Sequence, residues 1–155
     1  MSAELMTLKS PLGVLTVSAD GGVLRGIRFS STDFGRQPAA PALRSLADRL
    51  LAYFDGDLRA LDVISVDPEG TAFQREVWKA LLRIPAGRTW SYAELARAIG
   101  RPDAVRAVGA ANGANPIPIV IPCHRVIGAD GRLIGYGGGL DRKRWLLAHE
   151  GVRLL

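Results

Sequence analysis

The sequence is poor in cysteine, histidine and long apolar runs, and each shortage excludes a class of protein. One cysteine in 155 residues rules out an intramolecular disulfide and suits a reducing cytosol. One cysteine and two histidines are too few for an ordinary structural zinc site, so we expect no metal. No apolar run is long enough to cross a bilayer, and the first residues lack the basic and apolar blocks of a secretory signal. We therefore expect a cytoplasmic protein that has no membrane partner.

What the chain does have is an ordinary globular composition with an uneven charge. It is 48% hydrophobic and 23% charged, and its length suits one domain or two small ones. Residues 1–70 carry 7 Lys/Arg and 9 Asp/Glu, a net charge of −2, whereas residues 71–155 carry 13 and 6, a net charge of +7. A basic C-terminal half favours contact with a polyanion such as DNA, although a solvated basic surface gives the same count.

The first part of the chain, residues 1–68, is predicted to form a small α/β domain. Strands are expected over 12–17 and 23–29, and the turn residues over 19–22 predict that they form a hairpin. A loop over 30–41 and an amphipathic helix over 42–54 should follow, and 61–66 are predicted to form a further strand. The helix has apolar residues at helical spacing, namely Leu43, Leu46, Leu50 and Phe54. Nothing in this part is chemically distinctive, so we interpret it as scaffold.

The second part, residues 69–155, is predicted to be mainly helical, which makes the whole chain α+β. Pro and Gly within 67–70 mark the boundary. Thr71 with Gln74 has the spacing of a capping box and predicts that a helix follows. Ser91 and Glu94 repeat that spacing and predict a helix over 92–99. A last helix is expected over 141–149, where Asp141 would be the N-cap and Gly151 would end the helix.

The helix over 92–99 and another predicted over 103–112, separated by Gly100, are typical of a helix-turn-helix. The second helix offers mainly Arg106 to a partner, and its other residues are small: Ala107, Gly109, Ala110 and Ala111. Small residues permit close approach to a DNA backbone or a narrow groove. They also suit packing against another helix, which is the more frequent use of such a face.

The one cysteine, Cys123, follows a run of prolines and β-branched residues over 115–122, which predicts a stiff, extended approach. His124 and Arg125 come next, and a cationic neighbourhood lowers the pKa of a thiol and produces a nucleophilic thiolate. His124 and Glu150 are candidates for a base and for the carboxylate that orients it. A lone cysteine is also often an inert packing residue, and this stretch alone leaves both interpretations open.

At this point the chain resembles a known family, the O6-alkylguanine-DNA alkyltransferases (methylated-DNA–protein-cysteine methyltransferases). The resemblance rests on Ile121-Pro122-Cys123-His124-Arg125-Val126, the family's active-site signature. Further blocks match in order and spacing over 71–152. They are Phe73-Gln74, Val77-Trp78, Ser91-Tyr92, the run over 104–109, Asn115-Pro116 and the run over 145–151.

The resemblance implies DNA repair by direct reversal of damage. The alkyl group of an O6-alkylguanine in double-stranded DNA would pass irreversibly to Cys123, once per molecule and without a cofactor, after the base is flipped out. Repair of O4-alkylthymine is left open. The family's fold implies a ribonuclease H-like scaffold domain over 1–68 and a DNA-binding and alkyl-transfer domain over 69–155. It also implies a nucleoid-associated protein that is a monomer in solution, and cooperative binding to DNA is left open.

The family mechanism implies a role for each matching residue. Cys123 would be the alkyl acceptor, His124 the base that acts through a water, and Glu150 the group that orients His124. Asn115 matches the hinge residue between the active-site segment and the recognition helix. Tyr92 matches the hydroxyl that donates to the departing guanine.

Other matching positions concern DNA and the base pocket. Arg106 matches the finger that fills the gap left by the flipped nucleotide. The minor-groove helix would present Ala107, Gly109 and Ala110. The pocket for the base would be lined by Val126, Tyr136 and Gly137. Gly137 stands where many relatives carry a serine, which leaves the handling of bulky alkyl groups open.

Three other functions compete with this one. A damage-binding protein of the same fold would not need Cys123. A cysteine hydrolase would use Cys123 with His124 or His149 and would turn over many times, which requires an oxyanion hole. A plain helix-turn-helix regulator would bind undamaged DNA with sequence preference.

Overall fold

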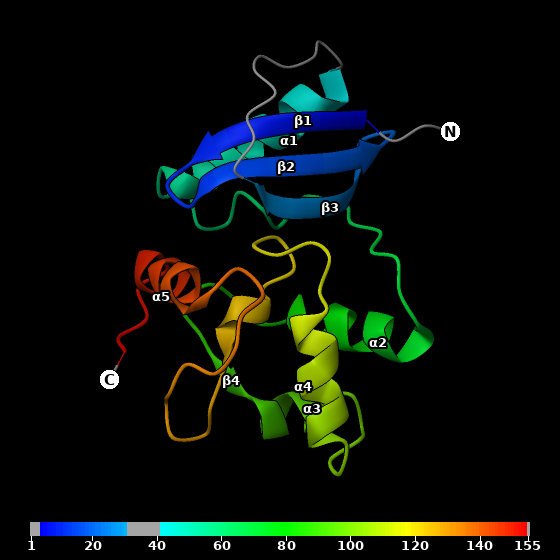
Figure 1. The fold of residues 1–155 in the computed structure, drawn as a ribbon, viewed down its shortest axis with the longest axis vertical. Coiled ribbons are helices and arrows are strands. Elements are labelled where there is room, and N and C mark those ends of the chain that lie inside the picture. Colours follow the sequence, from blue (N-terminus) through cyan, green and yellow to red (C-terminus); the bar gives the residue numbers. More distant parts are fainter. Residues whose placement is uncertain (1–3, 31–40, 155) are drawn as a thin grey trace. The chain divides into compact units, whose positions relative to one another are not determined.

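A computed structural model describes residues 4–30 and 41–154 of the chain (Figure 1). The chain divides into two compact units, Met1–Glu69 and Gly70–Leu155. Strands dominate the first and helices the second, which confirms the predicted α+β class. Within the described ranges, no helix has both the length and the apolarity needed to span a bilayer.

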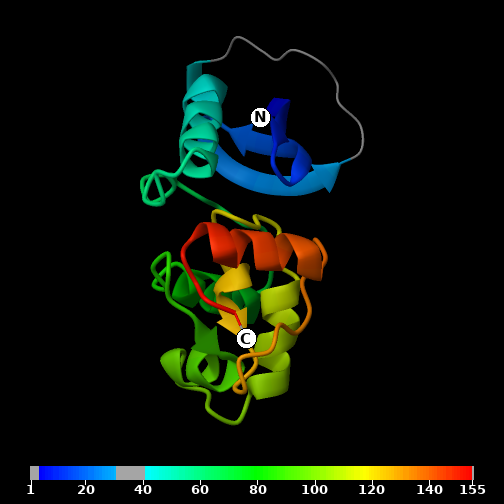
Figure 2. The same cartoon turned by 90° about the vertical axis from the view of Figure 1, so that its left-hand side faces the viewer.

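The first unit is a three-stranded antiparallel sheet with one helix against a face of it (Figures 1 and 2). The strands β1 (Glu4–Ser10), β2 (Gly13–Asp20) and β3 (Val23–Ser30) lie in that order, and α1 spans Pro41–Phe54. Gly21 and Gly22 have φ values of 58° and 85° and form the two-residue turn of the β2–β3 hairpin. Positive φ at both turn positions matches the right-handed twist of the strands. The predicted hairpin is therefore confirmed.

The sheet and α1 share an apolar core. Leu15, Val17 and Ala19 alternate along β2 and are fully buried, as expected for one face of a strand. The buried face of α1 consists of Leu43, Leu46, Leu50 and Tyr53. Tyr53 takes the place predicted for Phe54, because the buried stripe of this helix ends one residue earlier than the sequence pattern indicated.

Two predictions for the first unit need correction. The strand β1 was not predicted, although it pairs with β2 along its whole length. The strand predicted over 61–66 is wrong, because residues 61–63 form turns and only Val66 makes an isolated bridge to Leu24. Apart from its two end residues, the loop predicted over 30–41 lies outside the described residues.

The second unit arranges its helices around a short parallel pair of strands. The elements in chain order are α2 (Ala72–Leu81), β4 (Trp90–Ser91), α3 (Tyr92–Ala98), α4 (Val105–Gly113), the 3-10 helix η1 (Cys123–Arg125), β5 (Val126–Ile127) and α5 (Leu140–His149). The strand β4 pairs with β5 in parallel, and this brings the start of α3 beside the segment that follows Cys123. The helices α3 and α4 contact each other and form the predicted helix-turn-helix.

Both predicted capping boxes are confirmed. The amide of Gln74 donates to the Thr71 hydroxyl at 3.1 Å, and the Thr71 amide donates back to the Gln74 side chain at 3.0 Å. Ser91 and Glu94 form the same reciprocal pair at 3.1 and 2.8 Å. Each box satisfies two amides that a helix start leaves free, so α2 and α3 begin where the sequence indicated.

The start of α5 differs from its prediction. Gly139 is the N-cap residue and has a φ of 93°, which glycine adopts without steric cost. Asp141 therefore lies inside the first turn, where its charge still favours the positive end of the helix dipole. Gly151, with a φ of 87°, follows the C-terminus of the helix as predicted.

Candidate active site

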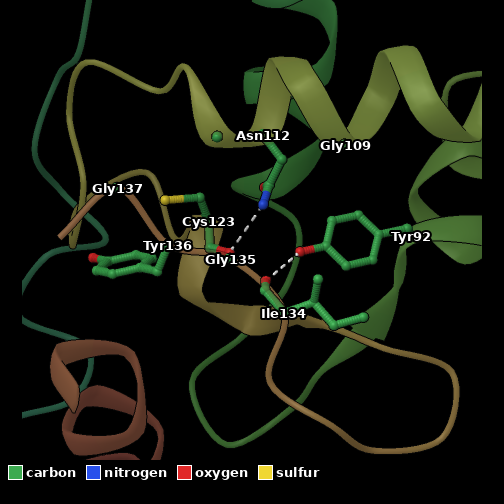
Figure 3. Close-up of a pocket in the computed structure, with 9 residues that line it drawn as sticks. Tyr92, Gly109, Asn112, Cys123, Ile134, Gly135, Tyr136 and Gly137 are labelled. Atoms are coloured by element: carbon green, nitrogen blue, oxygen red, sulfur yellow. Dashed lines mark hydrogen bonds between the residues drawn. The ribbon is translucent and has the colours of Figure 1, made fainter. Parts of the chain in front are cut away.

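Cys123 lines a cavity of about 270 Å³ in the second unit (Figure 3). The cavity lies between α4, the start of α3 and the loop before α5, and its size is close to the lower end for ligand pockets. Its lining residues are Tyr92, Gly109, Asn112, Gly113, Cys123, Ile134, Gly135, Tyr136 and Gly137. Segments far apart in the sequence thus meet around a single nucleophile.

Several residues singled out by the sequence meet at this cavity, and others lie behind it. Tyr92, Gly109, Cys123, Tyr136 and Gly137 line it. His124 and Glu150 are buried and do not line the cavity, and Asn115 lies just beyond α4. Val126 is not among the lining residues; its side chain is fully buried and its carbonyl accepts a hydrogen bond from Lys143.

The segment before Cys123 is a compact turn, which corrects the predicted extended approach. The amide of Val120 donates to Pro118 O at 2.9 Å, and that of Ile121 donates to Ile117 O at 3.0 Å. Ile119, between them, has a φ of 77°, which is costly for a β-branched residue. Prolines limit φ but do not prevent the chain from turning, so these local hydrogen bonds determine the path.

Asn115 holds this turn together from its first residue. Its Nδ2 donates to Ile121 O at 2.8 Å, and its Oδ1 accepts from the amide of Ile117 at 2.9 Å. Asn115 also lowers the pKa of the Cys123 thiol, because its side chain favours the thiolate. One amide therefore connects the end of α4 to the nucleophile's segment.

The resting state of Cys123 differs from the sequence prediction. Burial raises the pKa of the Cys123 thiol to about 11, and the Asn115 hydrogen bond and the Lys143 charge offset this only in part. The side chain is 6% exposed. Desolvation of the anion thus outweighs the cationic neighbourhood, and Cys123 is a neutral thiol that needs a base at the moment of reaction.

His124 has the properties of that base. Burial lowers its pKa, and the hydrogen bond with Glu150 opposes this only partly, so the imidazole is neutral near pH 7. Nε2 lies 2.9 Å from Oε2 of Glu150, which fixes the proton on Nε2. Nδ1 is buried and has no hydrogen-bond partner within the described part of the chain, so it is left as the basic nitrogen.

Glu150 is held as a carboxylate by Arg125 as well as by His124. Burial alone would raise the pKa of Glu150, but hydrogen bonds from Arg125 and His124 hold it well below its usual range. Arg125 contacts both carboxylate oxygens at 2.8 Å, and its Nη1 donates to Ile84 O at 2.6 Å. The guanidinium thus fixes the carboxylate that orients the imidazole.

Lys143 is a site residue that the sequence did not indicate. Its side chain is fully buried, and Nζ donates to Val126 O at 2.7 Å, Ile134 O at 3.1 Å and Gly135 O at 3.2 Å. Burial lowers the pKa of Lys143 to about 8, and a negative charge on Cys123 would oppose this shift. Lys143 ties the pocket loop to the strand after Cys123. A lysine between two arginines, Arg142 and Arg144, gives no sequence signal for this.

Tyr92 faces the pocket from the first residue of α3. Its hydroxyl donates to the carbonyl of another lining residue, Ile134 O, at 2.9 Å (Figure 3). Burial raises the pKa of Tyr92, and the nearby Cys123 adds to this, so the phenol keeps its proton. A protonated hydroxyl at the pocket edge is able to donate to a bound molecule.

The outer face of α4 carries Arg106, Ala107 and Ala110, all of which are exposed. Val108 and Ala111 point inward, and Ala111 O accepts from the indole nitrogen of Trp78 at 2.8 Å. The small residues of α4 therefore fall into two groups, which correspond to the two interpretations left open by the sequence: packing against another helix and close approach to a partner. Some pack against α2, while the rest leave a smooth, solvent-facing surface beside one arginine.

Family models match both parts of the chain. The model for the 6-O-methylguanine DNA methyltransferase ribonuclease-like domain matches residues 5–68, and that for the DNA binding domain matches residues 72–152. A methylated-DNA–protein-cysteine methyltransferase of Mycobacterium tuberculosis is 51% identical over 152 residues, covering 95% of this chain and 92% of the relative. A methylated-DNA–protein-cysteine methyltransferase of Salmonella typhimurium is 59% identical over 110 residues, which cover 71% of this chain and 64% of the relative.

Solved structures agree with these sequence matches. The crystal structure of Mycobacterium tuberculosis O6-methylguanine methyltransferase is similar to this chain, with a TM-score of 0.83 at 47% identity. The match covers 96% of this chain and 93% of the crystallised chain. The crystal structure of Mycobacterium tuberculosis OGT in complex with DNA has a TM-score of 0.83 at 49% identity. That match covers 94% of this chain and 91% of the crystallised chain.

Proposed function

The chain belongs to the 6-O-methylguanine DNA methyltransferase family, and we propose that Cys123 is the residue that accepts the alkyl group from damaged DNA. The family's activity, transfer of a methyl group from methylated DNA to a protein cysteine, is the activity of this chain. The observation that carries the assignment is that Cys123 lines the pocket and is followed directly in the chain by His124, whose imidazole is bound to the buried Glu150.

The first step is removal of the thiol proton. Because the Cys123 thiol is neutral at rest, its proton passes to Nδ1 of His124 through an intervening water as the alkyl carbon approaches. Glu150 stabilises the imidazolium that results, since its Oε2 already accepts from Nε2. Lys143 and Asn115 favour the negative charge on sulfur.

The second step is displacement at the alkyl carbon. The thiolate forms the S–C bond while the bond between that carbon and guanine O6 breaks, and the electron pair moves into the purine. The Tyr92 hydroxyl leaves Ile134 O and donates to the ring, so that it stabilises the charge on the departing base. The proton held by His124 returns through solvent to the guanine, which balances the reaction.

The product explains why each molecule reacts once. A thioether has no easy leaving group, and the chain holds no second cysteine that could accept another alkyl group. This outcome separates the reaction from a cysteine hydrolase, which must release its acyl group to water.

Access to the lesion requires a flipped base. The exposed face of α4 suits the minor groove, and the exposed Arg106 would fill the gap in the base stack when the alkylated guanine leaves it. Residues 1–68 serve as scaffold and residues 69–155 bind DNA and carry out the transfer. The protein acts as a monomer on double-stranded DNA that contains alkylated guanine, in the cytoplasm at the nucleoid.

A stoichiometry experiment tests this function. A duplex with one O6-methylguanine is incubated in excess over the protein, and the lesion that remains is measured over time. We expect a loss equal to one lesion per protein molecule, with no further reaction, and no loss with Cys123→Ser. Continuous turnover, or equal loss with the serine variant, would contradict the assignment.

A further inference from the structure

Trp78 is a buried side chain of α2 to which the reaction described above gives no role. It is 1% exposed, and α2 packs against α4, the helix that carries Arg106. The indole Nε1 of Trp78 donates to Ala111 O at 2.8 Å. This buried bond joins the second half of α2 to the last turn of α4.

The last turn of α4 has only long hydrogen bonds of its own. The amide of Ala114 lies 3.2 Å from Ala111 O, and that of Asn115 lies 3.4 Å from Asn112 O. The bond from the Trp78 indole is shorter than both, and it reaches a carbonyl at the helix end, where helices lack donors of their own. Trp78 therefore holds the end of α4 from outside the helix.

This end of α4 is also the end that is connected to the nucleophile. Asn112 donates to Cys123 O at 3.4 Å, and Asn115, just beyond the helix, holds the turn before Cys123. Arg106 lies five residues before Ala111, about 7.5 Å along the helix axis. A change of the helix direction at Ala111 would therefore move Arg106 relative to the thiol.

The opposite edge of the indole is fixed by Gly70. A Cβ at Gly70 would lie 2.5 Å from Cη2 and 2.6 Å from Cζ3 of Trp78, and 2.8 Å from Oε1 of Gln74. The two distances to the ring are far shorter than non-bonded carbon contacts, so a side chain at Gly70 would displace the indole. The ring is thus held by Ala111 O at its nitrogen and by the Gly70 backbone at its benzene edge.

We propose that Trp78 is a positioning residue that sets the direction of α4 relative to Cys123, so that the outer face of α4 engages duplex DNA while the flipped base reaches the thiol; this rests on the proposed function. Duplex DNA must meet both conditions at once. Free O6-methylguanine base needs only the pocket. A change at Trp78 therefore slows transfer from the duplex more than transfer from the free base.

Single-turnover transfer rates with an O6-methylguanine duplex and with the free base test this role. Trp78→Phe, which removes the indole N–H, should slow transfer from the duplex about 2–10-fold, as expected for one hydrogen bond, and change the free-base rate less than about twofold. Gly70→Ala, which displaces the ring from its other edge, should give the same pattern. Trp145→Phe makes the same chemical change on α5 and should alter neither rate.

A further control separates the position of α4 from the stability of α2. Thr71→Ala removes the side-chain cap of α2 without touching the indole, so it should lower the melting temperature and leave the ratio of the two rates unchanged. If Thr71→Ala lowers the duplex rate selectively, as Trp78→Phe is expected to, the effect comes from a weakened α2 and the proposal is overturned.

The remaining outcomes distinguish this inference from the function on which it rests. Equal slowing on duplex and free base by Trp78→Phe would show a merely structural role and overturn the proposal, and so would two unchanged rates. If phenylalanine prevents folding, Gly70→Ala decides in its place by the same criteria. If wild-type protein transfers methyl from neither substrate, the proposed function fails as well. Wild-type transfer with an unchanged ratio in both variants rejects the role of Trp78 alone.

Discussion

The guanidinium of Arg125 and the carboxylate of Glu150 form a two-point ion pair, with Nε and Nη2 each 2.8 Å from a carboxylate oxygen. Oε2 of Glu150 also accepts from His124, so one carboxylate oxygen serves both the base and the guanidinium. Arg125 precedes the strand after Cys123, whereas Glu150 ends α5. The ion pair therefore connects the segment that carries Cys123 to the end of α5, and it holds the carboxylate that orients the His124 imidazole.

Replacing Arg125 should destabilise the protein strongly. Arg125→Met leaves Glu150 as an unpaired buried carboxylate, and breaking such a pair commonly costs about 3–5 kcal/mol. Urea unfolding measures the change. The matched control is Arg59→Met, which removes an exposed pair with Asp62 and should change stability by less than about 0.5 kcal/mol. Similar losses from both variants would contradict a special role for the buried pair.

The pH dependence of transfer should follow His124. Burial lowers the pKa of His124 below its ordinary 6.5, so the neutral base persists as the pH falls to that value. We expect a transfer rate that is flat from about pH 8 to 6.5 and falls only below it. Glu150→Gln removes the group that raises the pKa of His124, so the acid limb should move to lower pH while the rate decreases. A rate that already falls above pH 6.5, or an upward shift in the variant, would be inconsistent with this assignment.

Arg106 should matter for duplex DNA but not for the chemical step. Arg106→Ala removes the exposed side chain that is proposed to replace the flipped base, and flipping costs a few kcal/mol. Transfer from a duplex should slow about tenfold or more, while reaction with free O6-methylguanine base should not change. The control is Arg144→Ala, which removes another exposed arginine, on α5. Equal slowing on duplex and free base would place Arg106 in the chemistry instead.

Position 137 offers a gain of function. A Cβ at Gly137 would meet only Gly113 O, at 3.8 Å, so Gly137→Ser should fold normally. Its hydroxyl would add a donor to the pocket wall and should speed transfer from O6-benzylguanine relative to O6-methylguanine by about 2–10-fold. Gly137→Ala supplies the same Cβ without the hydroxyl. If alanine produces the same change, volume rather than hydrogen bonding is responsible.

Local signals in the sequence predicted local structure well. Both capping boxes placed their helices because the reciprocal side-chain bonds need only four residues. The β2–β3 hairpin was predictable because Gly21 and Gly22 supply its turn. The strand β1 was missed because its stability comes from pairing with β2, which its own residues do not encode.

The site was predictable in its chemistry but not in its environment. The signature around Cys123 indicated a nucleophile, a base and an orienting carboxylate, whose individual roles stay predictions. Burial of the thiol, which reverses the expected pKa shift, depends on packing by distant segments. Lys143 gave no sequence signal, because its importance comes from carbonyls that only the fold brings together.

The central claim, that Cys123 accepts the alkyl group, is tested most directly by mass spectrometry of the protein after incubation with a duplex containing O6-methylguanine. We predict a gain of one methyl group per chain, located by fragmentation on Cys123 in the tryptic peptide 107–125, and no gain with Cys123→Ser. Tight binding of the damaged duplex without any gain in mass, or a methyl group on another residue, would contradict the account.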